Sequence, residues 1–197
     1  MIIKKYNFGI KQYLYNDVFS EDDKNLIISH LDENFFNIGK IEKKYPGYQT
    51  LYNHNLFQIN YDYFEKLKKT FIQSCKDYVN ISKIKFDIDH EKYGSKCWCY
   101  LNWKNSDRSG QEFHIHNKSN PFTISGIFYL KMPDDDENVG TKFLMGGNLI
   151  TLPSITNSWF IFPSNYGHIP GNPTNTKKRY VISADLWFTD YTVNDII

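Results

Sequence analysis

From residue 83 onward, hydrophobic side chains recur at every second position, as in a β-strand whose successive side chains face opposite sides. Turn-forming pairs and triplets such as Gly146-Gly147 and Gly171-Asn172-Pro173 separate the segments with this period. The segments are KIKFDI, KCWCYLNW, EFHIH, TISGIFYLKM, TKFLM, NLITL, SWFIF and RYVISADLWF. About eight short strands in about 105 residues predict a sandwich, a barrel or a jelly roll.

The first 82 residues predict helices and short strands that support the strand-rich part of the chain. Residues 13–19 look strand-like, and residues 37–58 read as loop and short strand. Ser20, followed by three acidic residues, resembles a helix N-terminus, so we expect a helix from about 21 to 34. A second helical period starts near Asn60 and runs to about residue 80. We expect both helices to pack against the outside of the sheet.

Composition excludes several classes of protein. The 197-residue chain has a formal net charge of +1, so no overall field points to nucleic acid or to an acidic membrane surface. It contains neither an apolar run of membrane-spanning length nor a recognisable signal peptide, which predicts a cytoplasmic protein. The three cysteines, Cys75, Cys97 and Cys99, have no disulfide spacing. We interpret Cys97 and Cys99 as core thiols rather than as a small metal motif.

Three histidines and one arginine in the strand-rich part predict a metal site. His114 and His116 are two residues apart, so on a strand both rings project from one face. His168 follows His116 by 52 residues, and Arg179 follows His168 by 11. Three imidazoles that converge inside a barrel bind a transition metal, and a nearby guanidinium holds a carboxylate through a two-pronged contact. The remaining histidines, His30, His54 and His90, are interpreted as ordinary satisfied polar groups.

Arginine itself is informative because the chain uses lysine for almost every positive charge. It has 21 lysines and only two arginines, Arg108 and Arg179. An arginine in so lysine-rich a chain hints that a planar, forked donor is needed at its position.

The motifs around these residues resemble the 2-oxoglutarate/Fe(II)-dependent oxygenases, in particular a small subgroup found in marine phages and bacteria. The likeness covers about residues 97–188. The matching pieces are Leu101-Asn102-Trp103, His114-Ile115-His116, Ser125-Gly126-Ile127-Phe128-Tyr129-Leu130, Phe162-Pro163-Ser164, His168, and Arg179 with Ser183. The resemblance implies one domain over residues 1–197, with a double-stranded β-helix (a jelly-roll, cupin-like barrel) at about 83–190 and N-terminal support at about 1–82.

The same resemblance implies roles for individual residues. His114 and His168 would be the two imidazole ligands of Fe(II), and Arg179 would pair with the distal carboxylate of 2-oxoglutarate. Tyr129 would donate to that carboxylate, and Ser183, which shares strand parity with Arg179, could add a hydroxyl. Asn102 could reach the carboxylate on the iron side.

One position departs from the pattern of the superfamily. Most members have Asp or Glu where this chain has His116, and an imidazole there leaves the Fe(II) centre one unit more positive. We expect His116 to be the third ligand. Two alternatives stay open: Glu112, on the same predicted face, could supply a carboxylate, or His116 could lie behind the ligands while water or halide completes the iron.

The predicted activity is hydroxylation of an unidentified substrate by O2, with 2-oxoglutarate converted to succinate and CO2. A protein side chain, a nucleobase and a small metabolite all remain open as substrates, and the oligomeric state is open too. The location would be the host cytoplasm if a phage encodes the chain. The alternatives are a three-histidine cupin-type metalloenzyme and a non-catalytic β-module. The module would use Trp103, Tyr166 and Trp187 as an aromatic platform.

Overall fold

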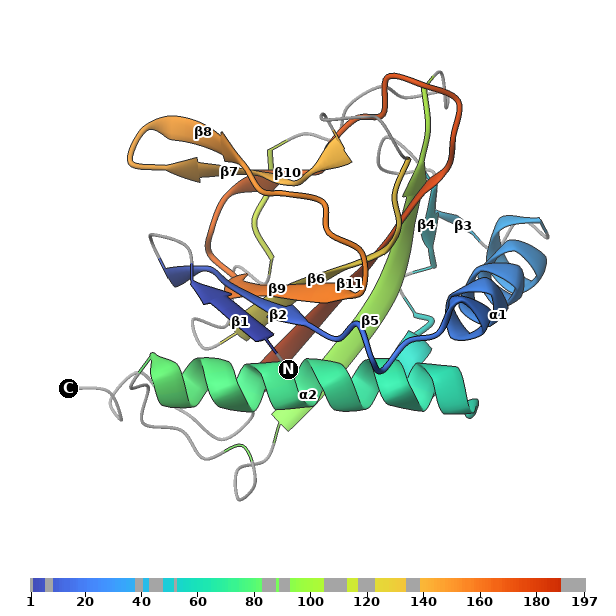
Figure 1. The fold of residues 1–197 in the computed structure, drawn as a ribbon, viewed down its shortest axis with the longest axis horizontal. Coiled ribbons are helices and arrows are strands. Elements are labelled where there is room, and N and C mark those ends of the chain that lie inside the picture. Colours follow the sequence, from blue (N-terminus) through green and yellow to red (C-terminus); the bar gives the residue numbers. More distant parts are fainter. Residues whose placement is uncertain are drawn as a thin grey trace.

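Two antiparallel sheets lie face to face and form the double-stranded β-helix that the sequence predicts (Figure 1). The computed structural model describes residues 2–5, 9–37, 41–42, 48–51, 53–82, 88, 93–104, 113–116, 123–133 and 139–188. The larger sheet has eight strands in the order β1-β2-β9-β6-β11-β5-β4-β3, and the smaller has three in the order β10-β7-β8.

The strands of the larger sheet are β1 (Ile2–Lys5), β2 (Lys11–Leu14), β3 (Ile41–Glu42), β4 (Tyr48–Thr50), β5 (Tyr93–Asn102), β6 (Thr123–Lys131), β9 (Ser158–Pro163) and β11 (Arg179–Phe188). Those of the smaller sheet are β7 (Lys142–Met145), β8 (Asn148–Thr151) and β10 (His168–Ile169). The helices are α1 (Glu21–Leu31), a π-helical turn η2 (Asp32–Phe36), a 3-10 turn η3 (Leu56–Gln58) and α2 (Asp62–Ile81).

The central strands of the larger sheet are buried on both faces. In β6, Ile124, Phe128 and Leu130 belong to a cluster on the outer face, whereas Ile127 and Tyr129 belong to a second cluster between the two sheets. β11 and β9 alternate in the same way. The two-residue period therefore divides each strand between a core under the helices and an interior that can hold a site.

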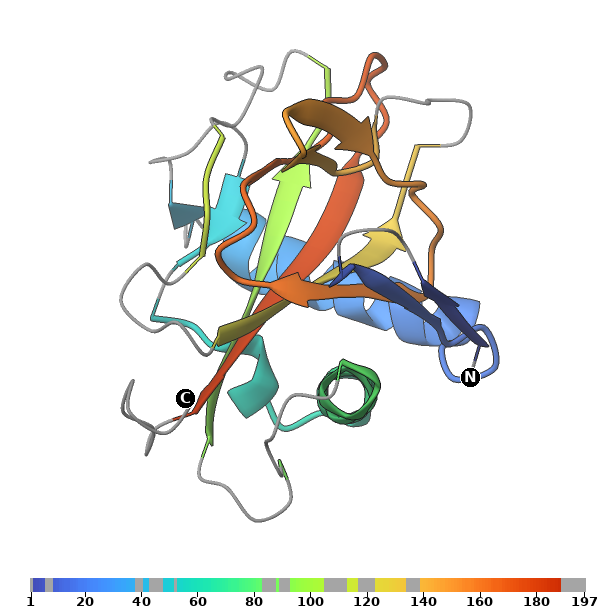
Figure 2. The ribbon, with the colours of Figure 1, turned by 90° about the vertical axis from the view of Figure 1, so that its left-hand side faces the viewer.

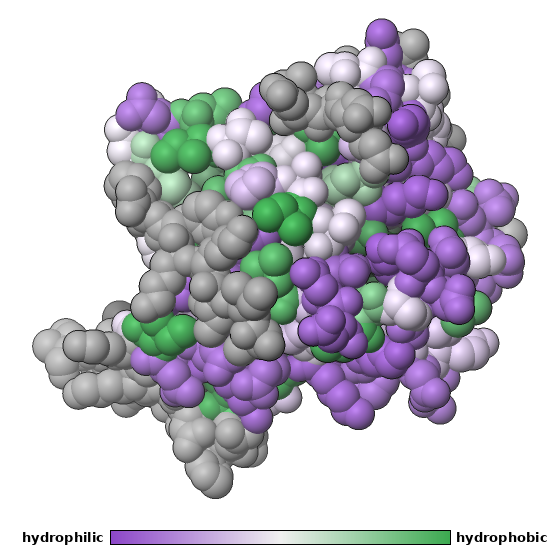
Figure 3. Space-filling model, in the orientation of Figure 1, coloured by the Kyte–Doolittle hydropathy of each residue, from purple (hydrophilic) through white to green (hydrophobic). Residues whose placement is uncertain are grey.

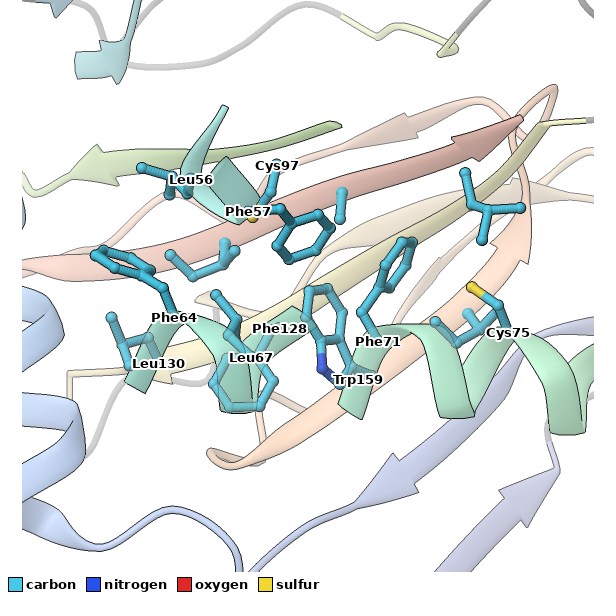
Figure 4. Close-up of a cluster of buried hydrophobic side chains, with 14 of the residues drawn as sticks. Leu56, Phe57, Phe64, Leu67, Phe71, Cys75, Cys97, Phe128, Leu130 and Trp159 are labelled. Atoms are coloured by element: carbon cyan, nitrogen blue, oxygen red, sulfur yellow. The ribbon is translucent and has the colours of Figure 1, made fainter. Parts of the chain in front are cut away.

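Helix α2 covers the outer face of the larger sheet (Figures 1 and 2). Its apolar stripe includes Phe64, Leu67 and Phe71, which are fully buried among side chains of the sheet (Figure 4). The rings of Phe71 and Trp159 lie 4.9 Å apart, and the indole Nε1 of Trp159 donates to Thr70 at 3.0 Å. The prediction that the second helix packs outside the sheet is confirmed.

The helix boundaries agree with the sequence, with one refinement. Ser20 caps α1, and a reciprocal capping box joins it to Asp23. The predicted helix over 21–34 is α1 to Leu31, continued by the π-turn to Phe36. The second helix begins at Asp62, two residues after the predicted start.

Several strand predictions need correction. The strand predicted over residues 13–19 is β2 at Lys11–Leu14, because residues 16–18 form a turn. The EFHIH segment is not a regular strand where it is described, since residues 113–116 contain one isolated bridge at His114. Strands β1 and β10 were not predicted. Residues 83–87, most of KIKFDI, lie outside the described residues, as do Glu112 and His90.

The Gly146-Gly147 turn joins β7 to β8 as the sequence predicts. Both glycines have positive φ, 55° and 81°, the backbone of a tight hairpin turn. Exposed Leu144 and Leu149 pair across this hairpin, and it forms part of the hydrophobic (green) area at the upper left of Figure 3. Within the described residues, no helix combines the length and the apolar character that a membrane span requires.

His30 on α1 makes the stability of the fold depend on pH. Its ring lies edge-on to Phe64 at 5.2 Å and to Tyr61 at 5.4 Å, and burial lowers the pKa of His30. The unfolded chain therefore takes up a proton near the ordinary histidine pKa of about 6.5, while the folded chain resists it to lower pH. We expect the His30→Gln variant to lose less unfolding free energy than the wild type as the pH falls below about 6.5. Urea titrations at pH 7.5 and 5.5 measure this, and equal losses in the two proteins would contradict it.

Candidate metal centre

The three predicted histidines meet where β10 approaches residues 113–116. His114 and His168 exchange two backbone hydrogen bonds, of 3.1 and 2.9 Å, and the amide of His116 donates to Ser164 O at 3.0 Å. Two backbone segments about fifty residues apart are thereby held side by side. The ring centroids of His114 and His168 are 4.4 Å apart, and those of His116 and His168 are 4.9 Å apart.

Gly167 allows this close approach. A Cβ built at Gly167 would lie 2.2 Å from ring atoms of Phe113, the residue before His114. A larger residue at position 167 would require the Phe113 ring to move. The glycine in PSNYGH therefore leaves room for the Phe113 ring beside the paired His114 and His168 segments.

His168 is the most enclosed of the three histidines, with 2% of its surface exposed. It packs between Phe143 and Phe162, with both ring centroids 5.3 Å away. Burial, and then the neighbouring His116 and His114, lower the pKa of His168 well below its usual value. Its Nδ1 donates to the backbone oxygen of Tyr166 at 3.0 Å, so the ring is neutral with the lone pair on Nε2. A neutral imidazole is the form that binds a metal.

His116 is held by a carboxylate that the sequence did not single out. Its Nδ1 lies 2.9 Å from Oδ1 of Asp185 on β11, and Ser125 on β6 donates to the same oxygen at 2.6 Å. A carboxylate oxygen accepts hydrogen bonds, so Nδ1–H of His116 donates to Asp185, and Nε2 is the ring nitrogen left to face a metal. Both side chains are mostly buried, with 9% and 14% exposed.

These imidazoles fit a metal ion. One ring nitrogen from each of His114, His116 and His168 lies within 4.8 Å of the other two. Three nitrogens bound at about 2.1 Å to one face of an ion lie about 3.0–3.6 Å apart, so the rings would move together by about 1–2 Å on binding. No Asp or Glu joins a three-residue group of this kind in the part of the chain that the structure describes. Three nitrogen donors suit iron, zinc, copper or nickel rather than calcium or magnesium.

Arg179, at the start of β11, is fully buried and incompletely paired. Its Nε donates to Val139 O at 2.8 Å, and one terminal nitrogen reaches Asn102 Oδ1 at 3.5 Å. The other terminal nitrogen is buried and has no hydrogen-bond partner among the described residues. Burial lowers the pKa of Arg179, yet a guanidinium stays protonated at neutral pH. A buried, charged donor without an acceptor is costly, and an anionic ligand would relieve that cost.

Asn102 and Tyr129 surround this guanidinium. Asn102 lies opposite Arg179 in the β5–β11 ladder, and its amide nitrogen donates to Gly171 O at 3.2 Å. The Tyr129 ring lies 5.9 Å from the guanidinium carbon. The hydroxyl of Tyr129 donates to Thr141 Oγ1 at 3.0 Å and accepts from the Thr141 amide at 2.9 Å. The structure thus brings both predicted residues to Arg179 and adds Thr141.

Ser183 has the predicted strand parity. It lies on β11 between Arg179 and Asp185, half-buried, opposite Trp98 on β5 and Ile127 on β6. Positions 179, 183 and 185 therefore share the face of β11 that carries Val181, a member of the cluster between the two sheets.

Of the residues that the structure describes, the cysteines, aromatic residues and other histidines considered in the sequence analysis lie apart from the histidine cluster or in the core. Cys97 and Cys99 are fully buried beneath the helices, and burial raises the pKa of each thiol. Trp103 stacks on Tyr48 at 5.1 Å, while Tyr166 packs against the cluster between the sheets. These contacts agree with core packing. His30 and His54 line a separate cavity of about 290 Å³ between η2 and η3.

No family model matches this sequence, and no curated protein matches it. Solved structures do match. The Pseudomonas putida prolyl-4-hydroxylase aligns with a TM-score of 0.64 at 10% identity, over 94% of this chain and 95% of that one. AviO1 from Streptomyces viridochromogenes aligns with a TM-score of 0.66 at 13% identity, over 93% and 91%. A 2OG-Fe(II) oxygenase family oxidoreductase from Burkholderia pseudomallei aligns with 0.61 at 10% identity, over 92% and 85%.

The chain has the fold of these three proteins. The match covers nearly the full length of both partners, so it includes the N-terminal helices as well as the β-helix. At 10–13% identity it is a statement about the fold. The case for a particular chemistry rests on the side chains described above.

Sequence reasoning missed Asp185, Ser125 and Thr141. Asp185 does carry a signal, because it is an acidic residue on the same inward parity of the strand as Arg179 and Ser183. Its partner His116 is 69 residues away, and that contact depends on how β11 and the 113–116 segment are placed. Ser125 and Thr141 have no such signal, since small hydroxyl residues are common on strands.

Proposed function

We propose that this protein is a non-haem Fe(II)- and 2-oxoglutarate-dependent dioxygenase that hydroxylates a substrate still to be identified. One observation carries the proposal: the metal-binding histidine cluster shares a barrel with a buried guanidinium that lacks an acceptor among the described residues. A metal site alone would need no such guanidinium. A metal chelated by a 2-oxo acid with a second carboxylate would use both.

The chain would contribute ligands and orientation. His114, His116 and His168 would hold Fe(II), leaving positions open for 2-oxoglutarate, O2 and substrate. Arg179 would bind the distal carboxylate of 2-oxoglutarate. Asn102, whose Oδ1 lies 3.5 Å from a terminal nitrogen of Arg179, would keep the guanidinium in place and reach the carboxylate on the iron side. Tyr129, whose hydroxyl is held by Thr141, would line the 2-oxoglutarate site beside Arg179, and Ser183 would add a hydroxyl to that site.

When bound, the iron and 2-oxoglutarate supply the redox chemistry: O2 is reduced, 2-oxoglutarate becomes succinate and CO2, and one oxygen atom enters a substrate C–H bond. The protein keeps water away from that centre. Phe143 and Phe162 pack against the buried His168, and Val181 lies between Arg179 and Ser183 on the inner face of β11. Such an apolar lining strengthens the electrostatic contacts of the bound dianion.

The test is a stepwise anaerobic titration. Fe(II) is added first and 2-oxoglutarate second, and we expect a weak visible charge-transfer band only after the second addition. Admitting air should then give succinate, even if slowly without the natural substrate. A protein that binds Fe(II) but shows neither the band nor succinate would contradict the proposal.

A three-histidine metalloenzyme of the cupin type is the second candidate. It is favoured by the absence of a carboxylate from the metal-binding group in the described residues. In that case the metal would bind with the same affinity whether or not 2-oxoglutarate is present. The unpaired donor of Arg179 argues for the first candidate.

A further inference from the structure

The hydrogen bond between His116 and Asp185 points to a function for a residue that has no role in the proposal so far. A facial site of two histidines and one carboxylate carries one negative charge, whereas three neutral imidazoles carry none. The substitution at position 116 therefore removes a charge from the ligands. In this chain a carboxylate lies 2.9 Å from the far nitrogen of that same ring.

We propose that Asp185 is a positioning residue that acts on the metal through His116. This inference rests on the proposed metal site. Asp185 accepts a hydrogen bond from Nδ1–H of His116 and thereby turns Nε2 toward His114 and His168. It also returns the missing negative charge to the site, one ring further from the metal. A carboxylate in this position makes an imidazole a more basic ligand.

The surroundings of Asp185 favour this role. Ser125 on the neighbouring strand donates to the same carboxylate oxygen at 2.6 Å, so the acceptor is fixed from β6 while it accepts from His116. Asp185 sits in the middle of the long β11 ladder, where both neighbouring strands restrain its backbone. The ring of Trp98 lies 5.3 Å from His116 and limits its rotation. The carboxylate and the ring are thus both held before any metal binds.

A second property separates Asp185 from a surface acid. Its side chain is 14% exposed, and that of His116 is 9% exposed. Buried acids are rare unless they are paired, and this one lies 2.9 Å from a ring of the histidine cluster. The geometry is therefore that of a carboxylate that orients a histidine ligand without contacting the metal itself.

The experiment uses Co(II) alone as the probe, added to the full-length protein without oxygen. The Asp185→Asn variant keeps an acceptor of the same shape but loses the charge. We expect its affinity for Co(II) to fall about 10- to 100-fold and its visible ligand-field bands to shift. Asp185→Glu should recover part of the affinity. Asp62→Asn makes the same charge change at an exposed site on α2 and should leave both readouts unchanged.

A measurement on the unmodified protein guards against variants that fold poorly. Long-range 1H–15N spectra of the metal-free wild type should show His116 protonated on Nδ1. A neutral His116 ring whose single proton is on Nε2 would overturn the inference, as would an Asp185→Asn variant with the Co(II) affinity and spectrum of the wild type.

The same Co(II) titrations distinguish a failure of the proposed metal site from a failure of the role of Asp185. If the wild type takes up no Co(II), or if His114→Ala binds it as tightly, then the proposed function and this inference fall together. If the wild type binds Co(II) through the histidines and Asp185→Asn is indistinguishable from it, only the role of Asp185 is lost.

Discussion

Replacing His168 by glutamine is expected to reduce Fe(II) affinity by more than about 100-fold and to abolish succinate formation. His168 is buried between two phenylalanines and offers its Nε2 to the cluster, so no water easily takes its place. Loss of a residue behind a ligand already costs about 10- to 100-fold in metal affinity, and loss of the ligand itself should cost more. Anaerobic Fe(II) titration measures the first effect and succinate release the second.

His54→Gln provides the matched control for this prediction. His54 is a half-buried histidine that packs edge-on against Phe35 at 5.3 Å, outside the metal-binding group. The same substitution there should leave Fe(II) affinity and turnover unchanged. If His168→Gln retained the affinity of the wild type, the assignment of the metal to this cluster would be wrong.

Replacing Arg179 by methionine is expected to weaken 2-oxoglutarate binding by about 100-fold or more while leaving Fe(II) affinity nearly unchanged. A two-pronged, charge-assisted contact in a buried site is worth about 3 kcal/mol or more, which corresponds to about 100-fold in affinity. The anaerobic charge-transfer titration gives the 2-oxoglutarate constant directly. Fe(II) binding alone gives the comparison, because Arg179 is not among the metal ligands.

The Arg179→Met variant is also expected to keep or raise the free energy of unfolding. In the absence of 2-oxoglutarate, the wild type buries a guanidinium with one nitrogen unpaired among the described residues. Methionine fills similar space without a charge, so the cosubstrate-free variant should be as stable as the wild type, or more so. Urea denaturation without 2-oxoglutarate tests this. Equal 2-oxoglutarate affinity in variant and wild type would contradict the role of Arg179, and a large loss of stability would show that the residue is structural.

The imidazole at position 116 connects the variant at Arg179 with the variant at Asp185. With no carboxylate among the proposed ligands, the dianionic cosubstrate meets a site whose charge depends on what lies around the imidazoles. Arg179 would supply positive charge to the distal carboxylate of 2-oxoglutarate, and Asp185 would supply negative charge behind His116. The variants at positions 179 and 185 should therefore separate cosubstrate affinity from metal affinity.

Much of the fold could be predicted from the sequence because runs of β-branched and aromatic residues between turn signals mark the central strands of the larger sheet. In β6 and β11 every second residue packs under the helices, and the others face the interior, so parity alone assigns each side chain to a face. Parity failed where strands are short or absent. β10 has only two residues, and residues 113–116 form a single bridge, which is too little for a periodic signal.

The sequence by itself determined the strand-rich barrel, the candidate histidines and Arg179, because residue type, spacing and strand parity are local properties of the chain. Only the tertiary structure decided which polar groups surround them. Asp185 reaches His116 across 69 residues, and Thr141 reaches Tyr129 from a segment that follows β6. Such contacts depend on strand register and on the pairing of His114 with His168 that places the 113–116 segment. Neither is encoded in the pattern of any one segment, so the partners of a buried ligand become visible only once the sheets are assembled.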